Sequence, residues 1–266
     1  MEFESILYER QDGVAIITLN RPARHNAITL AMSHELRQAW DRVKKDPQVV
    51  CAVLTGAGER ALCTGIDVAD VAGGRYASTG GSERSESPWF QLTAIQNRCW
   101  KPVITAVNGM ACGGGLHFVA DSDLIVCSET ATFFDTHVKV GLVAGLEPVG
   151  LARRLPLEAV LRMALLGGSE RIDARRAYEL GLVGEVVAPD RLMPRALELA
   201  GLIAQHSPTA LALSKQAIWE SLDVGLDEAL GRTWSTIRGH TDHPDLEEGS
   251  RAFVEKRKPR WAPYTG

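Results

Sequence analysis

The chain has 266 residues, of which 45% are hydrophobic and 23% charged, and its formal net charge is −4. A chain of this length buries a full hydrophobic core, and its charge balance provides no general basic field for nucleic acid or anionic lipid. The composition excludes a disordered chain, and we expect the partner to be a small molecule or a second copy of the chain.

The cysteines and the N-terminal segment indicate the compartment. The five cysteines are scattered, odd in number and never spaced C-x-x-C, so they predict neither a disulfide framework nor a zinc site. Residues 1–13, MEFESILYERQDG, are polar and acidic where a signal peptide is basic and then apolar, and no apolar run reaches membrane-spanning length. We therefore expect a cytoplasmic protein with no membrane partner.

The first half of the chain alternates between strand patterns and helix patterns. Apolar, β-rich runs closed by turn residues predict strands, and apolar residues at helical spacing predict the helices between them. The expected strands are residues 14–22, 49–58, 102–109 and 123–129, and the expected helices are 30–45 and 115–120. This repeated order predicts an α/β core of similar units.

From Pro148 onward the patterns become mostly helical, with a single expected strand at 182–188. The expected helices are residues 156–166, 173–180, 190–205, 208–221, 225–238 and 245–257. Before them, residues 73–87 are rich in glycine and serine and lie between two candidate site elements. Two interpretations of that segment are open, a mobile substrate lid and a plain surface loop.

Three consecutive glycines, Gly113 to Gly115, open the expected helix in MACGGGLHFVADSDLIV at 110–126. The N–H groups of a first helical turn lack intrahelical partners, and without Cβ atoms a carbonyl oxygen or an anion can reach them. These are the physical features of half an oxyanion hole. The glycines also fit a second interpretation, in which they only let the helix pack closely against a strand.

Several further motifs occur together with the glycine run, and no dinucleotide-binding, P-loop or G-x-S-x-G motif is present. In their order and spacing, they resemble the crotonase family, also called the enoyl-CoA hydratase/isomerase family, over nearly the whole chain. The motifs are NRPARHNAI (20–28), LTGAGERALCTGIDVAD (54–70), KPVITAVNGMACGGG (101–115), DSDLIV (121–126), LLGGSERIDARRAYELGLVGEVV (165–187) and SRAFVEKRK (250–258).

The resemblance implies an α/β crotonase (ClpP-like) spiral of ββα units over residues 1–200 and a helical trimerisation region over 201–266. It implies a homotrimer or a dimer of trimers, and a coenzyme A thioester as substrate with no further cofactor. By motif position, the backbone N–H groups of Ile66 and Gly114 would bind the thioester oxygen. Such donors stabilise the enolate that develops in the transition state more than the ground state.

The resemblance also implies contacts to coenzyme A. Arg24 and His25 match the loop beside the nucleotide, and Thr64 and Val68 flank the pantetheine path. Lys256, in FVEKRK, matches a basic residue that a neighbouring subunit supplies near the adenosine phosphate. The alternative interpretation of this C-terminal cluster is a solvated basic tail.

The chain departs from the family at the positions that carry acid and base. Hydratases of the family have glutamates where this chain has His117 and His137, and some other members have an aspartate where it has Gly145. Imidazoles can exchange protons near neutral pH, so both histidines are candidate catalytic residues that could share a water. Glu147 is a third candidate, which either replaces a missing carboxylate or only leads into the next helix.

These departures leave the reaction open. Hydration or isomerisation of a 2-enoyl-CoA is the default prediction, while two imidazoles also suit thioester hydrolysis, ring cleavage or decarboxylation. A non-catalytic acyl-CoA binding protein is the alternative of another class. We expect no metal, because His117, His137 and Asp135 lack the usual ligand spacing, and no RNA partner, because the net charge is negative.

Overall fold

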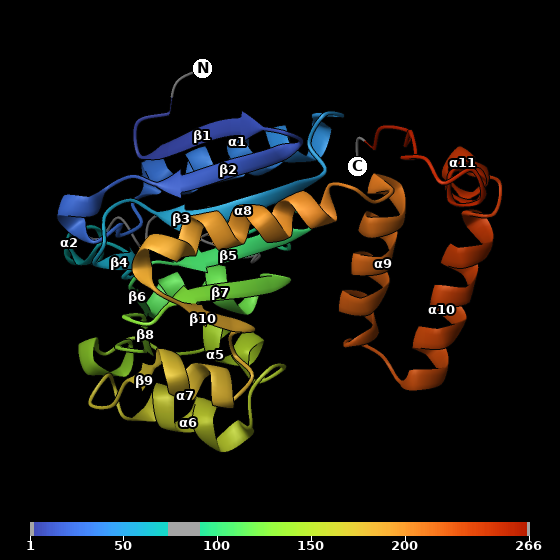
Figure 1. The fold of residues 1–266 in the computed structure, drawn as a ribbon. Coiled ribbons are helices and arrows are strands. Elements are labelled where there is room, and N and C mark those ends of the chain that lie inside the picture. Colours follow the sequence, from blue (N-terminus) through green and yellow to red (C-terminus); the bar gives the residue numbers. More distant parts are fainter. Residues whose placement is uncertain (1–2, 74–90, 265–266) are drawn as a thin grey trace.

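Two β-sheets form the core of the computed structural model, which describes residues 3–73 and 91–264 (Figure 1). The six-stranded sheet has the order β1-β2-β3-β5-β7-β10, and it is parallel except for the antiparallel pair of β1 and β2. Its strands are β1 (Ile6–Gln11), β2 (Val14–Leu19), β3 (Cys51–Gly56), β5 (Val103–Val107), β7 (Leu124–Ser128) and β10 (Glu185–Val187).

The second sheet has the order β4-β6-β8-β9, and each of its first three strands closely follows a strand of the first sheet along the chain. The chain passes from β3 to β4, from β5 to β6 and from β7 to β8, which is a spiral of ββα units. The strands of this sheet are β4 (Ala61–Cys63), β6 (Met110–Cys112), β8 (Thr132–Phe134) and β9 (Ile172–Asp173).

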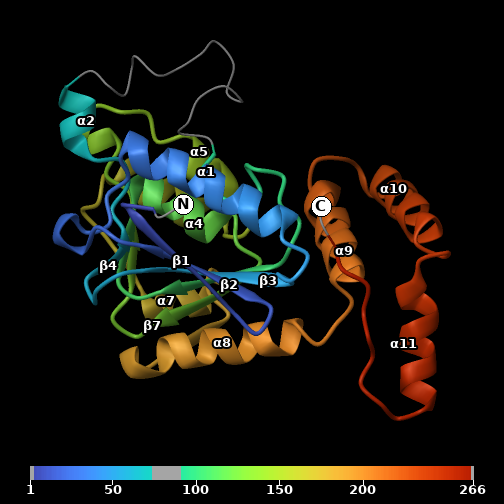
Figure 2. The same cartoon turned by 90° about the horizontal axis from the view of Figure 1, so that it is seen from above.

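Helices α1 (Leu30–Lys45) and α8 (Leu192–Ile203) cover opposite faces of the six-stranded sheet, as Figure 2 shows. The side chains of β2 alternate between these two helices. Ala15 and Ile17 share a buried cluster with α1, whereas Val14 and Ile16 share one with α8. Both faces of the sheet are therefore buried, which explains why its central strands are apolar at almost every position.

The elements around the glycine run are short. Gly113–Leu116 forms a 3-10 turn (η4), which continues directly into α4 (His117–Ala120). Helix α5 (Leu146–Leu151) packs against both, and α6 (Leu157–Leu165) and α7 (Ala174–Glu179) follow it. The glycine run thus lies at the end of β6, between the second sheet and α5.

The last three helices, α9 (Pro208–Ser221), α10 (Leu226–Gly239) and α11 (Pro244–Val254), extend away from the two sheets in both views (Figures 1 and 2). Helix α9 is tied to the core by buried polar contacts. Lys215 forms an ion pair with Asp123 at 2.8 Å, and the indole N–H of Trp219 donates to the other oxygen of Asp123 at 2.8 Å. The predicted division at residue 201 stays a prediction.

The longer predicted elements are confirmed within one to three residues at most of their ends, including α1, α9 and strands β2, β3, β5 and β7. The chain between Pro148 and the C-terminus contains a further short strand, β9, that the helical pattern did not indicate. The helix expected at 115–120 is a 3-10 turn followed by a single α-helical turn. Residues 74–87 of the glycine- and serine-rich segment, with its two open interpretations, lie outside the described residues.

The five cysteines are all buried and free of disulfide bonds. Burial raises the pKa of the Cys51, Cys63 and Cys127 thiols to about 12, because a thiolate is poorly solvated inside the protein. Cys63 lies directly beside the glycine run but stays protonated at neutral pH. It is therefore a packing residue and lacks the thiolate that a nucleophile needs.

Gly115 tests the close packing that places the glycine run. A Cβ at this residue would lie 2.3 Å from the carbonyl oxygen of Cys63, which belongs to backbone and cannot move aside. We expect Gly115→Ala to lower the free energy of unfolding by about 1–3 kcal/mol, the usual cost of overpacking, measured by chemical denaturation. Gly201→Ala is the control, because a Cβ on that exposed residue of α8 meets nothing within 4 Å. Equal stability of Gly115→Ala and wild type would contradict this packing.

Candidate active site

The backbone N–H groups of Ile66 and Gly114 lie close together. A Cβ on Gly65 would lie 2.9 Å from the nitrogen of Gly114, and a Cβ on Gly114 would lie 3.6 Å from the nitrogen of Ile66. Neither N–H donates any of the turn, loop or cap hydrogen bonds found within residues 3–73 and 91–264. Two adjacent donors without such partners are the geometry that an oxyanion hole requires.

A short parallel bridge between Ile28 and Ile66 orients one of these donors. The N–H of Ile28 donates to the carbonyl of Gly65 at 2.8 Å, and its carbonyl accepts from the N–H of Asp67 at 2.9 Å. Because N–H groups alternate in direction along an extended chain, the N–H of Ile66 points away from Ile28. The bridge therefore turns this donor toward the glycine run.

Glu147 reaches the glycine run from α5. It belongs to the first turn of that helix, and its side chain is buried. Its Oε1 lies 3.7 Å from the point where a Cβ on Gly114 would be, and 3.3 Å from Nε2 of His117. Glu147 thus lies in the first turn of the helix and also brings a carboxylate close to the glycine run, while its part in the reaction stays a prediction.

His117 is the first residue of α4 and is buried between two side chains. Its Nε2 faces Glu147, and its Nδ1 lies 3.2 Å from the side-chain nitrogen of Gln96. Both ring nitrogens therefore have partners within the protein. Sequence reasoning missed Gln96, although the spacing of Thr93 and Gln96 is that of a T-x-x-Q capping box, a local signal for a fixed turn.

His137 lies in the loop between β8 and the next 3-10 turn (η5, Val138–Val140), where Asp135 holds it. Its backbone N–H donates to Oδ1 of Asp135 at 2.8 Å, and its Nδ1 lies 2.9 Å from Oδ2. The Asp135 hydrogen bond raises the pKa of His137 above the ordinary histidine value of about 6.5. The negative charge of Glu147 adds to this effect, and burial opposes it.

The Cε1 atom of the His137 ring faces the glycines. A Cβ on Gly113 would lie 3.5 Å from Cε1, 3.9 Å from Nε2 and 4.0 Å from Nδ1 of His137. Gly113 has a φ of +52°, a conformation that glycine adopts without strain. The site thus combines two backbone N–H donors, one carboxylate and one imidazole, with His117 behind the carboxylate.

Four of the five predicted coenzyme A residues lie around the loop that carries Ile66. The hydroxyl of Thr64 donates to the carbonyl of His25 at 3.3 Å, and Arg24 forms an ion pair with Asp67 at 3.6 Å. Val68 is exposed at the start of α2 (Val68–Ala72). Lys256 is not brought to this loop within one chain, because it follows α11 at the far end of the molecule from α2 (Figure 1).

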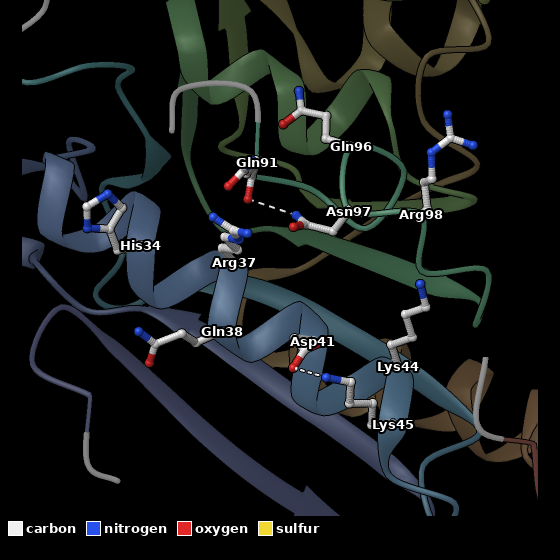
Figure 3. A pocket seen from close by; sticks show the side chains of 10 residues that line it. All are labelled: His34, Arg37, Gln38, Asp41, Lys44, Lys45, Gln91, Gln96, Asn97 and Arg98. Atoms are coloured by element: carbon white, nitrogen blue, oxygen red, sulfur yellow. Dashed lines mark hydrogen bonds and ion pairs between the residues drawn. The ribbon is translucent and has the colours of Figure 1, made fainter. Parts of the chain in front are cut away.

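A large polar recess lies between α1 and the segment 91–98, with a volume of about 820 Å³ (Figure 3). Its lining carries Arg37, Lys44, Lys45 and Arg98, against a single acid, Asp41, which pairs with Lys45 at 2.9 Å. Gln96 lines the recess and also contacts His117. The amide of Gln96 therefore stands between this basic recess and the buried histidine.

Among the described residues, no group of three or more His, Cys, Asp or Glu side chains is arranged to hold a metal ion. Within the same part of the chain, no helix is both long enough and apolar enough to cross a membrane. In place of a metal site, His137 pairs with Asp135 and His117 pairs with Glu147.

A spiral of ββα units with paired N–H donors at a glycine run defines the class to which this chain belongs. The family model described as enoyl-CoA hydratase/isomerase matches residues 9–263. The chain belongs to the enoyl-CoA hydratase/isomerase family, and it is an enzyme of that family with the crotonase fold, as the sequence motifs predicted.

Particular relatives agree with this assignment. The chain is 35% identical to (E)-benzylidenesuccinyl-CoA hydratase of Thauera aromatica, over 96% of this chain and 97% of that protein. It is 31% identical to the short-chain-enoyl-CoA hydratase of Clostridium acetobutylicum, over 97% of each. A crystal structure of an enoyl-CoA hydratase/isomerase from Mycobacterium paratuberculosis is similar at a TM-score of 0.90, with 41% identity over 98% of this chain and 99% of that one.

The pair of Asp135 and His137 makes the site sensitive to pH. We expect Asp135→Asn to lower the pKa of His137, since a neutral amide stabilises the imidazolium less than a carboxylate does. The measurement is an NMR titration of the His137 ring. The raised pKa also means that the pair stabilises the fold fully below about pH 6.5, the ordinary pKa of an unfolded-state histidine, and that this stability is lost as the pH rises through the folded-state pKa.

The control titrates exposed His206 in the same two proteins, and its pKa should not change. An unchanged His137 pKa in Asp135→Asn would show that the hydrogen bond does not control this ring.

Proposed function

We propose that the protein adds water to the double bond of a 2-enoyl-CoA thioester. The observation that carries the proposal is the position of Glu147, whose Oε1 lies beside Gly114 on the same glycine run that faces His137. The curated relatives described above are named as hydratases, which supports the same reaction. The thioester itself is the substrate, and the proposed reaction uses no further cofactor.

The thioester oxygen would accept hydrogen bonds from the N–H groups of Ile66 and Gly114. As water adds at Cβ, negative charge moves onto this oxygen, and the two donors stabilise the resulting enolate. Removing one donor from a comparable site in another enzyme costs about 2.7–4 kcal/mol, so this contact supplies a large share of the rate. These donors serve every reaction that passes through the enolate, so they do not by themselves select hydration.

Glu147 and His137 divide the proton transfers. The Glu147 carboxylate takes one proton from water as the remaining hydroxide bonds to Cβ, and the protonated Nε2 of His137 then gives a proton to Cα. The raised pKa of His137 favours the imidazolium that this second step needs. A proton passing from Glu147 to His137 through solvent restores the starting state, so the sum is the addition of one water molecule.

His117 has a supporting part in this scheme. Its Nε2 lies 3.3 Å from the Glu147 carboxylate, and both side chains are buried. A buried carboxylate without a hydrogen-bond donor carries a large desolvation penalty. Of the two histidines proposed from sequence as acid/base residues, His137 retains that part, while His117 stabilises the carboxylate that replaces the glutamate missing at its own position.

Hydration can be tested with purified protein and a panel of short, medium and cyclic 2-enoyl-CoA thioesters. We expect loss of the conjugated thioester absorbance and a product heavier by one water. Glu147→Gln and His137→Asn should each lower kcat by about 10²- to 10⁴-fold, the usual contribution of a general acid or base. Activity should also fall as the pH rises through the raised pKa of His137, because the imidazolium is then lost.

Matched controls are Glu129→Gln and His206→Asn. They make the same two substitutions at exposed residues and should leave turnover unchanged. Product masses separate the alternatives. Double-bond migration without added water indicates isomerisation, free coenzyme A thiol indicates a hydrolase, and carbon dioxide indicates a decarboxylase. Tight binding with no product from any thioester would indicate a non-catalytic acyl-CoA binding protein.

We also propose that the chain assembles as a trimer or as a dimer of trimers. Four large apolar side chains of α10 are exposed, and their spacing places them along one side of the helix: Leu226, Leu230, Trp234 and Ile237. An apolar stripe of this extent on a surface helix indicates a protein contact. In such an assembly, Lys256 would reach the coenzyme A loop of a neighbouring chain.

Trp234→Glu tests the assembly. Placing a carboxylate in the stripe should convert the oligomer to monomer, because burying an unpaired charge at an interface is unfavourable. Sedimentation velocity measures the change in mass. Ser235→Glu, which adds the same charge at the next exposed position, is the control. A monomeric wild-type protein at micromolar concentration would contradict the proposed trimer.

A further inference from the structure

The side-chain amide of Gln96 has a defined orientation. Its Oε1 accepts hydrogen bonds from the backbone N–H groups of Leu92 at 2.8 Å and Thr93 at 3.4 Å. In return, the hydroxyl of Thr93 accepts from the backbone N–H of Gln96 at 3.3 Å. This reciprocal pair is a capping box, and it closes the turn that spans residues 93–97. Because backbone N–H groups only donate, the oxygen must face them and the NH₂ group must face away.

The NH₂ group of Gln96 faces His117. Its nitrogen lies 3.2 Å from Nδ1, and since it can only donate, Nδ1 must accept. A neutral imidazole has one N–H, which therefore lies on Nε2. This nitrogen lies 3.3 Å from Oε1 of Glu147. The capping box thus determines which nitrogen of a buried histidine carries the proton.

We propose that Gln96 is a positioning residue, which holds His117 as the neutral Nε2–H tautomer and so fixes the Glu147 carboxylate beside the glycine run. The effect on turnover rests on the proposed function, whereas the tautomer itself does not. A proton on Nδ1 would place two N–H groups against each other. Gln96 therefore excludes both the other neutral tautomer and the imidazolium.

The charged groups around His117 make this constraint necessary. Glu147 faces the ring from α5, and Asp121 lies one turn further along α4. Burial raises the pKa of Asp121, which accepts a hydrogen bond from the Thr93 hydroxyl at 2.7 Å, and a positive charge on His117 would oppose that shift. Glu147 and Asp121 thus both interact with His117, and the amide of Gln96 opposes a proton at its Nδ1.

Loss of this constraint would weaken the proposed base. An imidazolium at His117 would hold the Glu147 carboxylate by a charge-assisted hydrogen bond, which is about twice as strong as a neutral one. A carboxylate held in this way takes a proton from water less readily. With His117 neutral, Glu147 keeps one hydrogen bond for orientation and remains available as a base.

Gln96→Glu should reverse the direction of the hydrogen bond between residue 96 and Nδ1 of His117, and it should leave the turn intact. One oxygen of the introduced carboxylate can still accept from the N–H groups of Leu92 and Thr93, while the other faces Nδ1 and requires a proton there. The matched control is Gln38→Glu, which makes the same change on an exposed residue of α1 in the same recess (Figure 3).

The direct measurement is the pair of ring ¹⁵N chemical shifts of His117 in histidine-labelled protein, assigned by comparison with His117→Asn. Wild type and Gln38→Glu should show a neutral ring protonated at Nε2 near pH 7, and Gln96→Glu should show a proton on Nδ1. A wild-type ring protonated at Nδ1, or unchanged ring shifts in Gln96→Glu, would overturn the inference. The wild-type spectrum shows which nitrogen of His117 carries the proton even if the variant does not fold.

Turnover of the preferred thioester gives the second readout. We expect Gln96→Glu to lower kcat at least about tenfold with little change in KM, since it weakens a base whose whole contribution is about 10²- to 10⁴-fold. Unchanged kcat with a changed tautomer would remove the proposed link to catalysis. If no thioester of the panel is hydrated but the wild-type ring is protonated at Nε2, the hydratase proposal fails and the tautomer inference stands.

Discussion

The approach of two backbone segments, 63–66 and 113–115, is the constraint on which the site depends. Parallel pairing of β4 with β6, which sets Ala61 opposite Met110 and Cys63 opposite Ala111, brings these segments together. Past the ends of the strands the backbones come closer than side chains allow, because a Cβ on Gly65 would meet the nitrogen of Gly114 at 2.9 Å. The glycines thus allow close packing, and this packing places the two N–H groups side by side, while their part as an oxyanion hole stays a prediction.

The acidic group of this site comes from a different element than the family motif indicates. The motif position on α4 holds His117, and the carboxylate arrives from the first turn of α5, where Glu147 is buried. Nε2 of His117 lies 3.3 Å from this carboxylate, so a polar group accompanies the buried acid. With the carboxylate supplied by α5 instead of α4, one carboxylate and one imidazole, those of Glu147 and His137, lie at the glycine run. The site is therefore less negative than one with two glutamates.

Long elements and local motifs were predictable from sequence, and contacts between distant segments were not. Periodicity located α1 and the apolar strands, because burial on one helical face or on two sheet faces leaves a pattern in the chain. The three-residue strands β4, β6 and β8 are too short to show a period.

Some candidate site residues were likewise predictable from local motifs, and others were not. The positions of Ile66 and Gly114 followed from the motifs, and the structure brings their nitrogens together. That Glu147 turns into the site depends on how α5 packs against α4, which no local pattern indicates. The place of Lys256 depends on a second chain.

The two histidines show why residue type alone does not assign a role. Asp135 lies at Nδ1 of His137, and this contact raises the pKa of the ring. At Nδ1 of His117 the neighbour is instead the amide nitrogen of Gln96. In the proposed mechanism, identical side chains thus become a proton-exchanging group and a fixed donor through the partner at one nitrogen. Asp135 lies two residues from its histidine and is visible in the local sequence, whereas Gln96 lies 21 residues away and is recognised only in the folded chain.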